Sequence, residues 1–175
     1  MPTYAQAVGG GPPRFDDYPV TRIFAGIPAP PKLTTKPARL YRTRIREAVE
    51  KARGVERSGK GQARPGPNFA GNMIVAQWSS GAPGMEMAMV DAETGDVYCP
   101  PISFHGIGVE SFDLPLLTLG LTVSRNPEIH FRPNSRLMII EATPKQTRQH
   151  PSYTYFFLWQ DHAWTLLKRL PLRGE

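Results

Sequence analysis

One segment of the chain carries apolar side chains with helical spacing. Residues 38–53 place apolar positions at intervals of three and four, so that these side chains share one face of an α-helix. The positions are Tyr41, Ile45, Ala48, Val49 and Ala52. Pro37 stands just before the segment, where a helix tolerates proline, and Gly54 follows it and can end it. We therefore predict one N-terminal helix over residues 38–53.

From residue 69 onwards the pattern changes to short apolar or alternating runs, which favour β-strands. The runs cover residues 73–78, 85–90, 97–99, 129–132, 137–142, 153–159 and 163–170, and the last two form the clearest hairpin. Strands that follow one another with no helix between them argue against a parallel sheet. We predict an α+β fold with one N-terminal helix packed on a bent antiparallel sheet of about six to seven meandering strands. Residues 102–127 fit neither pattern, and we expect a long connection there with at most one short strand.

The chain divides into an arm and a single domain. Residues 1–37 contain eight prolines and predict an extended Pro/Gly-rich arm, in which residues 15–24 could add an edge strand or pack over the sheet. Residues 38–175 predict one α+β domain, with a basic loop at 54–68 and the strands at 69–170. The length of 175 residues suits one domain of this kind.

Composition and charge narrow the classes of function. With 40% apolar and 10% aromatic residues, the chain is a folded protein, and no run reaches the ~20 apolar residues of a membrane helix. The net charge is +6 and is uneven: residues 1–71 have a balance of +8 and residues 72–175 of −2. The basic segment Arg39–Arg64 therefore makes a binder of an anionic surface or a nucleic acid one alternative function.

Candidate catalytic groups are few. Cys99, His105 and Asp113 occur in an order that could form a thiol triad, and Glu110 lies in the same connection. A hydrolase with a site around His105 is therefore a second alternative. The four histidines match no zinc-binding spacing, so we predict no metal and no cofactor. The acidic turn at residues 91–96 lacks the spacing of a calcium loop, and we expect Asp91 to bond to backbone amides of the turn.

Aromatic and basic side chains give the candidate binding residues. Tyr153, Tyr155, Phe157 and Trp159 alternate on one face of a predicted strand, and such a stripe is usually core. The other face of this strand is also apolar, which fits a central strand under the helix. A face left open would instead bind a partner. The candidate binding residues are Arg42, Arg46, Arg53, Tyr153 and Tyr155.

Several short segments resemble a family of small exported bacterial proteins of unknown activity. That family carries Asn-Phe-Ala-Gly-His-Tyr, Trp-Gly-Cys-Gly-x-x-Cys, Asp-Ala-x-Thr-Gly and Ser-Arg-Leu segments before a Tyr-rich hairpin. The matching pieces here are Asn68–Gly71, Trp78, Gly81, Asp91–Gly95, Ser135–Leu137 and Tyr153–Trp159. The family histidine falls on Asn72, and its two cysteines fall on Ser80 and Gly84, so the disulfide of that turn is absent. The resemblance implies a periplasmic or secreted location and no particular reaction.

A non-enzymatic binding domain is the leading hypothesis for function. No coherent set of acid, base, nucleophile and metal ligands accompanies the well-supported core. The resemblance implies export, with a signal peptide already removed, and a cytoplasmic location is the alternative. We expect a protein partner, as for an inhibitor, an immunity protein or a component of envelope assembly. We do not expect nucleic acid to be the main partner.

Overall fold

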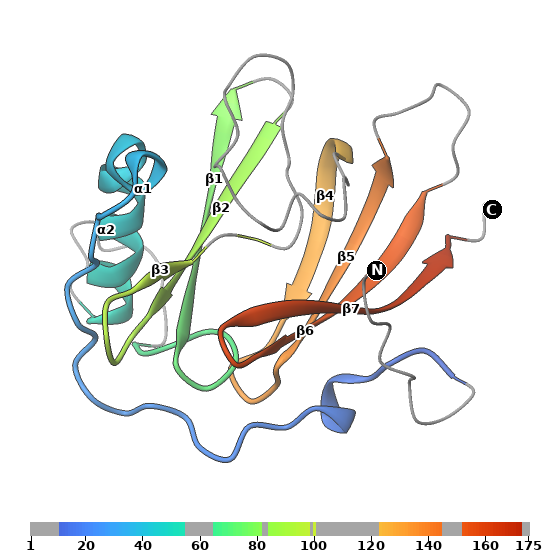
Figure 1. Cartoon of the computed structure of the whole chain (residues 1–175), viewed down its shortest axis with the longest axis horizontal. Helices are drawn as coiled ribbons and strands as arrows, with labels where there is room; N and C mark the ends of the chain where they lie inside the picture. Colours follow the sequence, from blue (N-terminus) through green and yellow to red (C-terminus); the bar gives the residue numbers. More distant parts are fainter. Residues whose placement is uncertain are drawn as a thin grey trace.

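The computed structural model describes residues 11–54, 65–81, 84–98, 100, 123–144 and 152–172. It confirms the α+β fold: a main helix packs on antiparallel sheets of three and four strands (Figure 1). The helical elements are η1 (Phe15–Asp17), α1 (Lys36–Leu40) and α2 (Arg42–Ala52). The strands are β1 (Met73–Gly81), β2 (Gly84–Asp91), β3 (Val97–Tyr98), β4 (Val123–Phe131), β5 (Leu137–Pro144), β6 (Tyr153–Gln160) and β7 (Ala163–Pro171).

The predicted helix is interrupted near its start. Tyr41 has φ −99° and ψ 20°, outside helical geometry, and it separates α1 from α2. The Thr35 hydroxyl accepts a hydrogen bond of 3.2 Å from the backbone N–H of Ala38, so α1 begins with a capped first turn that contains Pro37. Ile45, Val49 and Ala52 are buried on the apolar face that the spacing predicted.

The seven strands form two sheets, each of which is a simple antiparallel meander. The orders are β1-β2-β3 and β4-β5-β6-β7. The predicted hairpin of β6 and β7 is confirmed, with Trp159 opposite Trp164. β4 begins at Val123, so the end of the expected connection 102–127 is strand, and residues 101–122 lie outside the described residues.

The three-stranded sheet is buried on both faces. Side chains alternate along a strand, so Ile74, Ala88 and Val90 share a hydrophobic cluster with the apolar face of α2. The opposite face packs against the four-stranded sheet in a second cluster rich in Met and aromatic side chains. That cluster includes Met73, Met87, Met89, Met138, Ile140, Tyr155, Phe157 and Trp164. The molecule is therefore layered as helix, sheet and sheet.

The outer face of the four-stranded sheet is partly covered by the N-terminal arm. Residues 11–35, which we call the strap, pass along one end of both sheets before reaching α1 (Figure 1). Phe15 and Tyr18 pack beside Leu137 and Phe156. β6 is thus a central strand that is buried on both sides, as predicted. Its outer face is covered by the strap and not by the helix, because the helix packs on the three-stranded sheet.

Main-chain hydrogen bonds fix the strap to both sheets. The N–H of Val20 donates to the carbonyl of Asn134 beside the four-stranded sheet, at 3.1 Å. The N–H groups of Ala29 and Lys32 donate to the carbonyls of Ala92 and Gly95 beside the three-stranded sheet, at 2.8 and 2.7 Å. Over its described part, the arm is therefore packed as part of the domain.

Candidate functional site

The candidate catalytic residues fall outside the part of the chain that the structure describes. Cys99, His105, Glu110 and Asp113 all belong to this group. The hydrolase alternative therefore stays a prediction from the sequence.

The five candidate binding residues do not share one surface. Arg42 and Arg46 are exposed on α2, whereas the Nε of Arg53 donates to the carbonyl of Pro28 at 2.7 Å and holds the strap. Tyr153 lies half-buried on β6, in the other sheet, with the Arg169 guanidinium 4.7 Å from its ring centroid. Tyr155 is fully buried in the core, as expected for an aromatic stripe, and is not accessible to a partner.

The acidic turn after β2 has the structural role that the sequence predicted. One carboxylate oxygen of Asp91 accepts hydrogen bonds from the N–H groups of Glu93 and Thr94, at 2.7 and 3.0 Å. Its other oxygen accepts from Nδ2 of Asn72 at 3.0 Å. Asn72 thus helps to anchor this turn.

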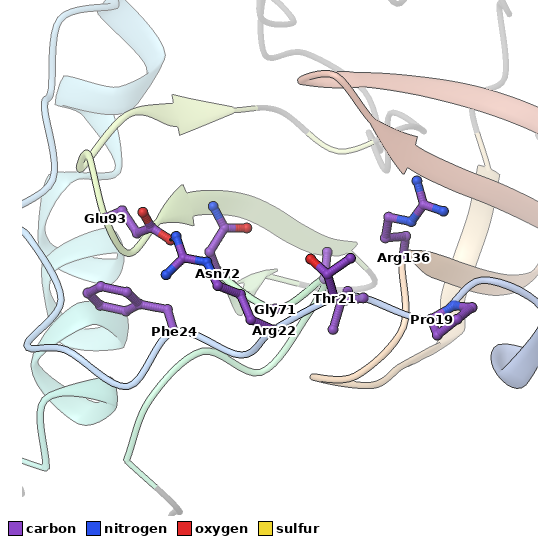
Figure 2. Close-up of a pocket in the computed structure, with 10 residues that line it drawn as sticks. Pro19, Thr21, Arg22, Phe24, Gly71, Asn72, Glu93 and Arg136 are labelled. Carbon is purple, nitrogen blue, oxygen red and sulfur yellow. The ribbon is translucent and has the colours of Figure 1, made fainter.

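A polar pocket of about 390 Å³ lies between the strap and the ends of the two sheets (Figure 2). The segment before β1, the turn after β2 and the segment before β5 meet here, contributing Gly71, Asn72, Glu93 and Arg136. Backbone N–H groups of Ala70 and Gly71 donate to the carbonyls of Ser135 and Pro133, which ties the sheets together.

Both arginines of this pocket have a partner within the molecule. Arg22 forms a 2.7 Å ion pair with Glu93, and Nη1 of Arg136 donates to Gln160 at 3.1 Å. In Figure 2, the two arginine side chains diverge towards these separate regions instead of converging on one point. These side chains therefore hold the strap and the sheets together, and they do not form a single binding point for a ligand.

A larger groove, of about 570 Å³, lies between α2 and β1. Five consecutive residues of β1, from 74 to 78, form its floor. Arg44, Glu47 and Lys51 of α2 form one wall, and Phe131 of β4 contributes on another side. The groove thus extends along several consecutive residues of β1.

Among the described strands, β1 lies at the edge of its sheet and pairs with β2 alone. The side chain of Asn68 covers the start of its outer edge by bonding to both main-chain groups of Val75. The main-chain groups of Val75 therefore point away from β2, and strand geometry turns those of Gln77 in the same direction. Gln77 is exposed, and none of the described residues bonds to its outward-facing N–H or carbonyl.

The helical wall of the groove carries two cations and one carboxylate. Arg44 and Lys51 are exposed beside the groove, and Glu47 pairs with Arg44 at 3.5 Å. An exposed pair of this kind is weak and leaves the guanidinium available to a second anion. The exposed basic residues of the two helices are Lys36, Arg39, Arg42, Arg44, Arg46 and Lys51.

Trp78 is held in place at one end of the floor. Its ring centroid lies 5.0 Å from that of Tyr41, and the Tyr41 hydroxyl donates to the buried carboxylate of Glu86 at 3.4 Å. Burial, and next the Glu86 charge, raise the pKa of Tyr41, so this hydroxyl keeps its proton. Trp78 is therefore a fixed aromatic surface next to the open part of the edge.

Comparison with known proteins assigns neither a family nor a function to the chain. No family model, curated protein or solved structure is significantly similar to the chain. The exported family described above stays a prediction from short segments. Among the described helices, none is both long enough and apolar enough to cross a membrane.

Sequence reasoning identified the basic helix but not the groove. Gln77 is the only strongly polar residue in the predicted strand at 73–78, and this was the available signal for an exposed edge. The signal was weak, because a polar residue in a strand is equally compatible with an edge covered by another strand.

Proposed function

We propose that the protein is an interaction domain that binds an extended, acidic segment of a partner protein along β1. The observation that carries this proposal is the outward main chain of Gln77 on the floor of the groove, to which none of the described residues bonds. An edge strand of this kind is a template for a further strand. Main-chain hydrogen bonds supply affinity in such complexes, and side-chain pockets supply selectivity.

The groove provides both kinds of contact. An incoming strand would bond to the N–H and carbonyl of Gln77 and would continue the sheet beyond the position that Asn68 occupies. Its alternate side chains would lie towards α2 and towards Phe131. The fixed ring of Trp78 offers an apolar contact at one end.

Charge favours an acidic partner over a second copy of the chain. Pairing of two β1 edges would bring two basic α2 helices close together, and the rims at Arg44 and Lys51 would repel each other. Aspartate or glutamate side chains on the added strand would instead meet these cations. Electrostatic complementarity of this kind mainly raises the association rate and the specificity.

The biological setting of this activity is part of the proposal. The family resemblance supports an exported domain, and an inhibitor, an immunity protein or a component of envelope assembly would each use such a binding edge. A nucleic acid could also contact the basic helix, but the main-chain edge at Gln77 favours a polypeptide.

Peptide display against the purified protein would test the proposal. We expect the selected peptides to be extended and rich in Asp and Glu, and their binding to weaken with salt. Gln77→Pro removes the outward N–H without removing a bond to β2, so it should reduce binding at least tenfold while the melting temperature is kept. Gln77→Ala is the matched control and should bind normally.

The outcomes separate the alternatives. Equal binding by the Gln77→Pro and Gln77→Ala proteins would contradict strand addition. Selection of peptides without acidic residues would contradict the charge argument. Tight binding of a DNA duplex, with no peptide selected, would favour the nucleic-acid alternative.

A further inference from the structure

A histidine and two carboxylates gather on the outer face of the four-stranded sheet. Glu128 and His130 lie two residues apart on β4 and therefore share a face, and Glu141 lies opposite Glu128 on β5. The Glu128 and His130 side chains are exposed, and Glu141 is half-buried. This cluster is separate from the groove, because alternation along β4 puts His130 on the opposite face from Phe131.

The spacing of the three side chains suits a common ion. One ligand atom from each residue lies within 4.8 Å of those of the other two, and Nε2 of His130 is 3.8 Å from Oε2 of Glu128. Donors that share a zinc ion at about 2.0–2.2 Å lie roughly 3.4 Å from one another in a tetrahedron. The separations exceed this value by roughly 0.4 to 1.4 Å, so the side chains must rotate towards one another when the ion binds.

The chemistry of the set also favours a cation. Two carboxylates directly opposite each other on neighbouring strands repel, and a cation between them removes that cost. The imidazole adds a nitrogen donor, which suits Zn²⁺ better than the oxygen-preferring Mg²⁺ and Ca²⁺. The backbone positions are fixed by paired strands, so little chain ordering is needed when the ion binds.

We propose that Glu128, His130 and Glu141 form a Zn²⁺ site with three protein ligands, completed by water on its exposed side. Histidine spacing alone does not reveal this site, because one ligand comes from the neighbouring strand. The site is independent of the proposed peptide groove, and either could be present without the other.

Calorimetric titration of the full chain with Zn²⁺ tests the proposal. We expect a site of one ion per chain whose affinity falls about 100-fold or more in His130→Ala and in Glu141→Gln. The control His162→Ala removes an exposed histidine of the β6–β7 turn and should leave this affinity unchanged. Millimolar Mg²⁺ should not displace the ion.

A second readout guards against effects of the substitutions on folding. In NMR spectra of the unsubstituted protein, Zn²⁺ should shift the imidazole resonances of His130 and leave those of His162 in place. Unchanged zinc affinity in His130→Ala, or perturbation of His162 instead of His130, would overturn the proposal. Weak binding that involves several histidines equally would show adventitious binding only and would also overturn it.

Discussion

The side-chain amide of Asn68 pairs with the main chain of Val75 as a neighbouring strand would. Its Nδ2 donates to the carbonyl of Val75 at 3.2 Å, and its Oδ1 accepts from the N–H of Val75 at 2.7 Å. Just before this point, Phe69 bonds to Met73 through its main chain. The outer edge of β1 is thus covered as far as Val75, and Gln77 is the next outward-facing position.

Asn68→Ala should destabilise the protein by about 1–3 kcal/mol, because it leaves two main-chain groups of a buried residue without partners. Denaturant unfolding measures this change. Gln77→Ala is the control, since its exposed amide has no such role, and it should change stability by less than about 0.5 kcal/mol. Equal stability of the two variants would show that the Asn68 bonds do not matter.

The close passage of the strap over Gly71 gives a second prediction. Gly71 has φ +81°, and a β-carbon there would collide with the carbonyl oxygen of Arg22. Gly71→Ala should therefore reduce the free energy of unfolding by about 1–3 kcal/mol or more, and should expose the strap to limited proteolysis.

Gly66→Ala is a control that separates the strain of a positive φ from the collision with Arg22. Gly66 also has a positive φ, of +106°, but no heavy atom of the described residues lies within 4 Å of the position of an added β-carbon. Gly66→Ala should cost only the backbone strain, about 1 kcal/mol. If both variants lose the same stability and neither is cleaved faster in the strap, the contact with Arg22 does not anchor it.

The buried hydroxyl of Tyr155 should make the stability of the protein depend on pH in the alkaline range. Burial raises the pKa of Tyr155 above its ordinary value near 10, and the Arg169 charge offsets this only in part. Above pH 10 the unfolded chain releases this proton more readily than the folded protein does, so stability falls as pH rises through the folded pKa.

Tyr155→Phe should reduce that loss of stability as the pH is raised above 10, as measured by denaturant unfolding at each pH. At pH 7 the variant should be about as stable as the unsubstituted protein, because none of the described residues offers the buried hydroxyl a hydrogen bond of good geometry, and Arg169 near it contributes only a weak interaction. A variant with an unchanged alkaline slope, or one destabilised by several kcal/mol at pH 7, would contradict this account.

Local patterns predicted most of the elements. Alternation at residues 153–159 and the turn at Asp161 were enough for the β6–β7 hairpin, because each signal is contained in a short stretch. The break at Tyr41 was not visible, since this residue continues the apolar periodicity although its backbone leaves the helix.

Long-range relationships were harder to predict. A meander has the same pattern of apolar and polar residues whether its strands form one bent sheet or two packed sheets. The strap is attached largely through main-chain hydrogen bonds, which leave no trace in the residue pattern. The groove depends on which edge of β1 is left open beside α2, and this follows only from the assembled fold.

The state of the Gln77 amide tests the central claim most directly. Residue-resolved hydrogen exchange of the protein without a partner should show rapid exchange at Gln77 and slow exchange at Ala76 and Trp78, whose N–H groups face β2. A bound acidic peptide should slow exchange at Gln77. If Gln77 is already protected as strongly as Ala76 in the unbound protein, its edge is not open, and the proposed binding site is wrong.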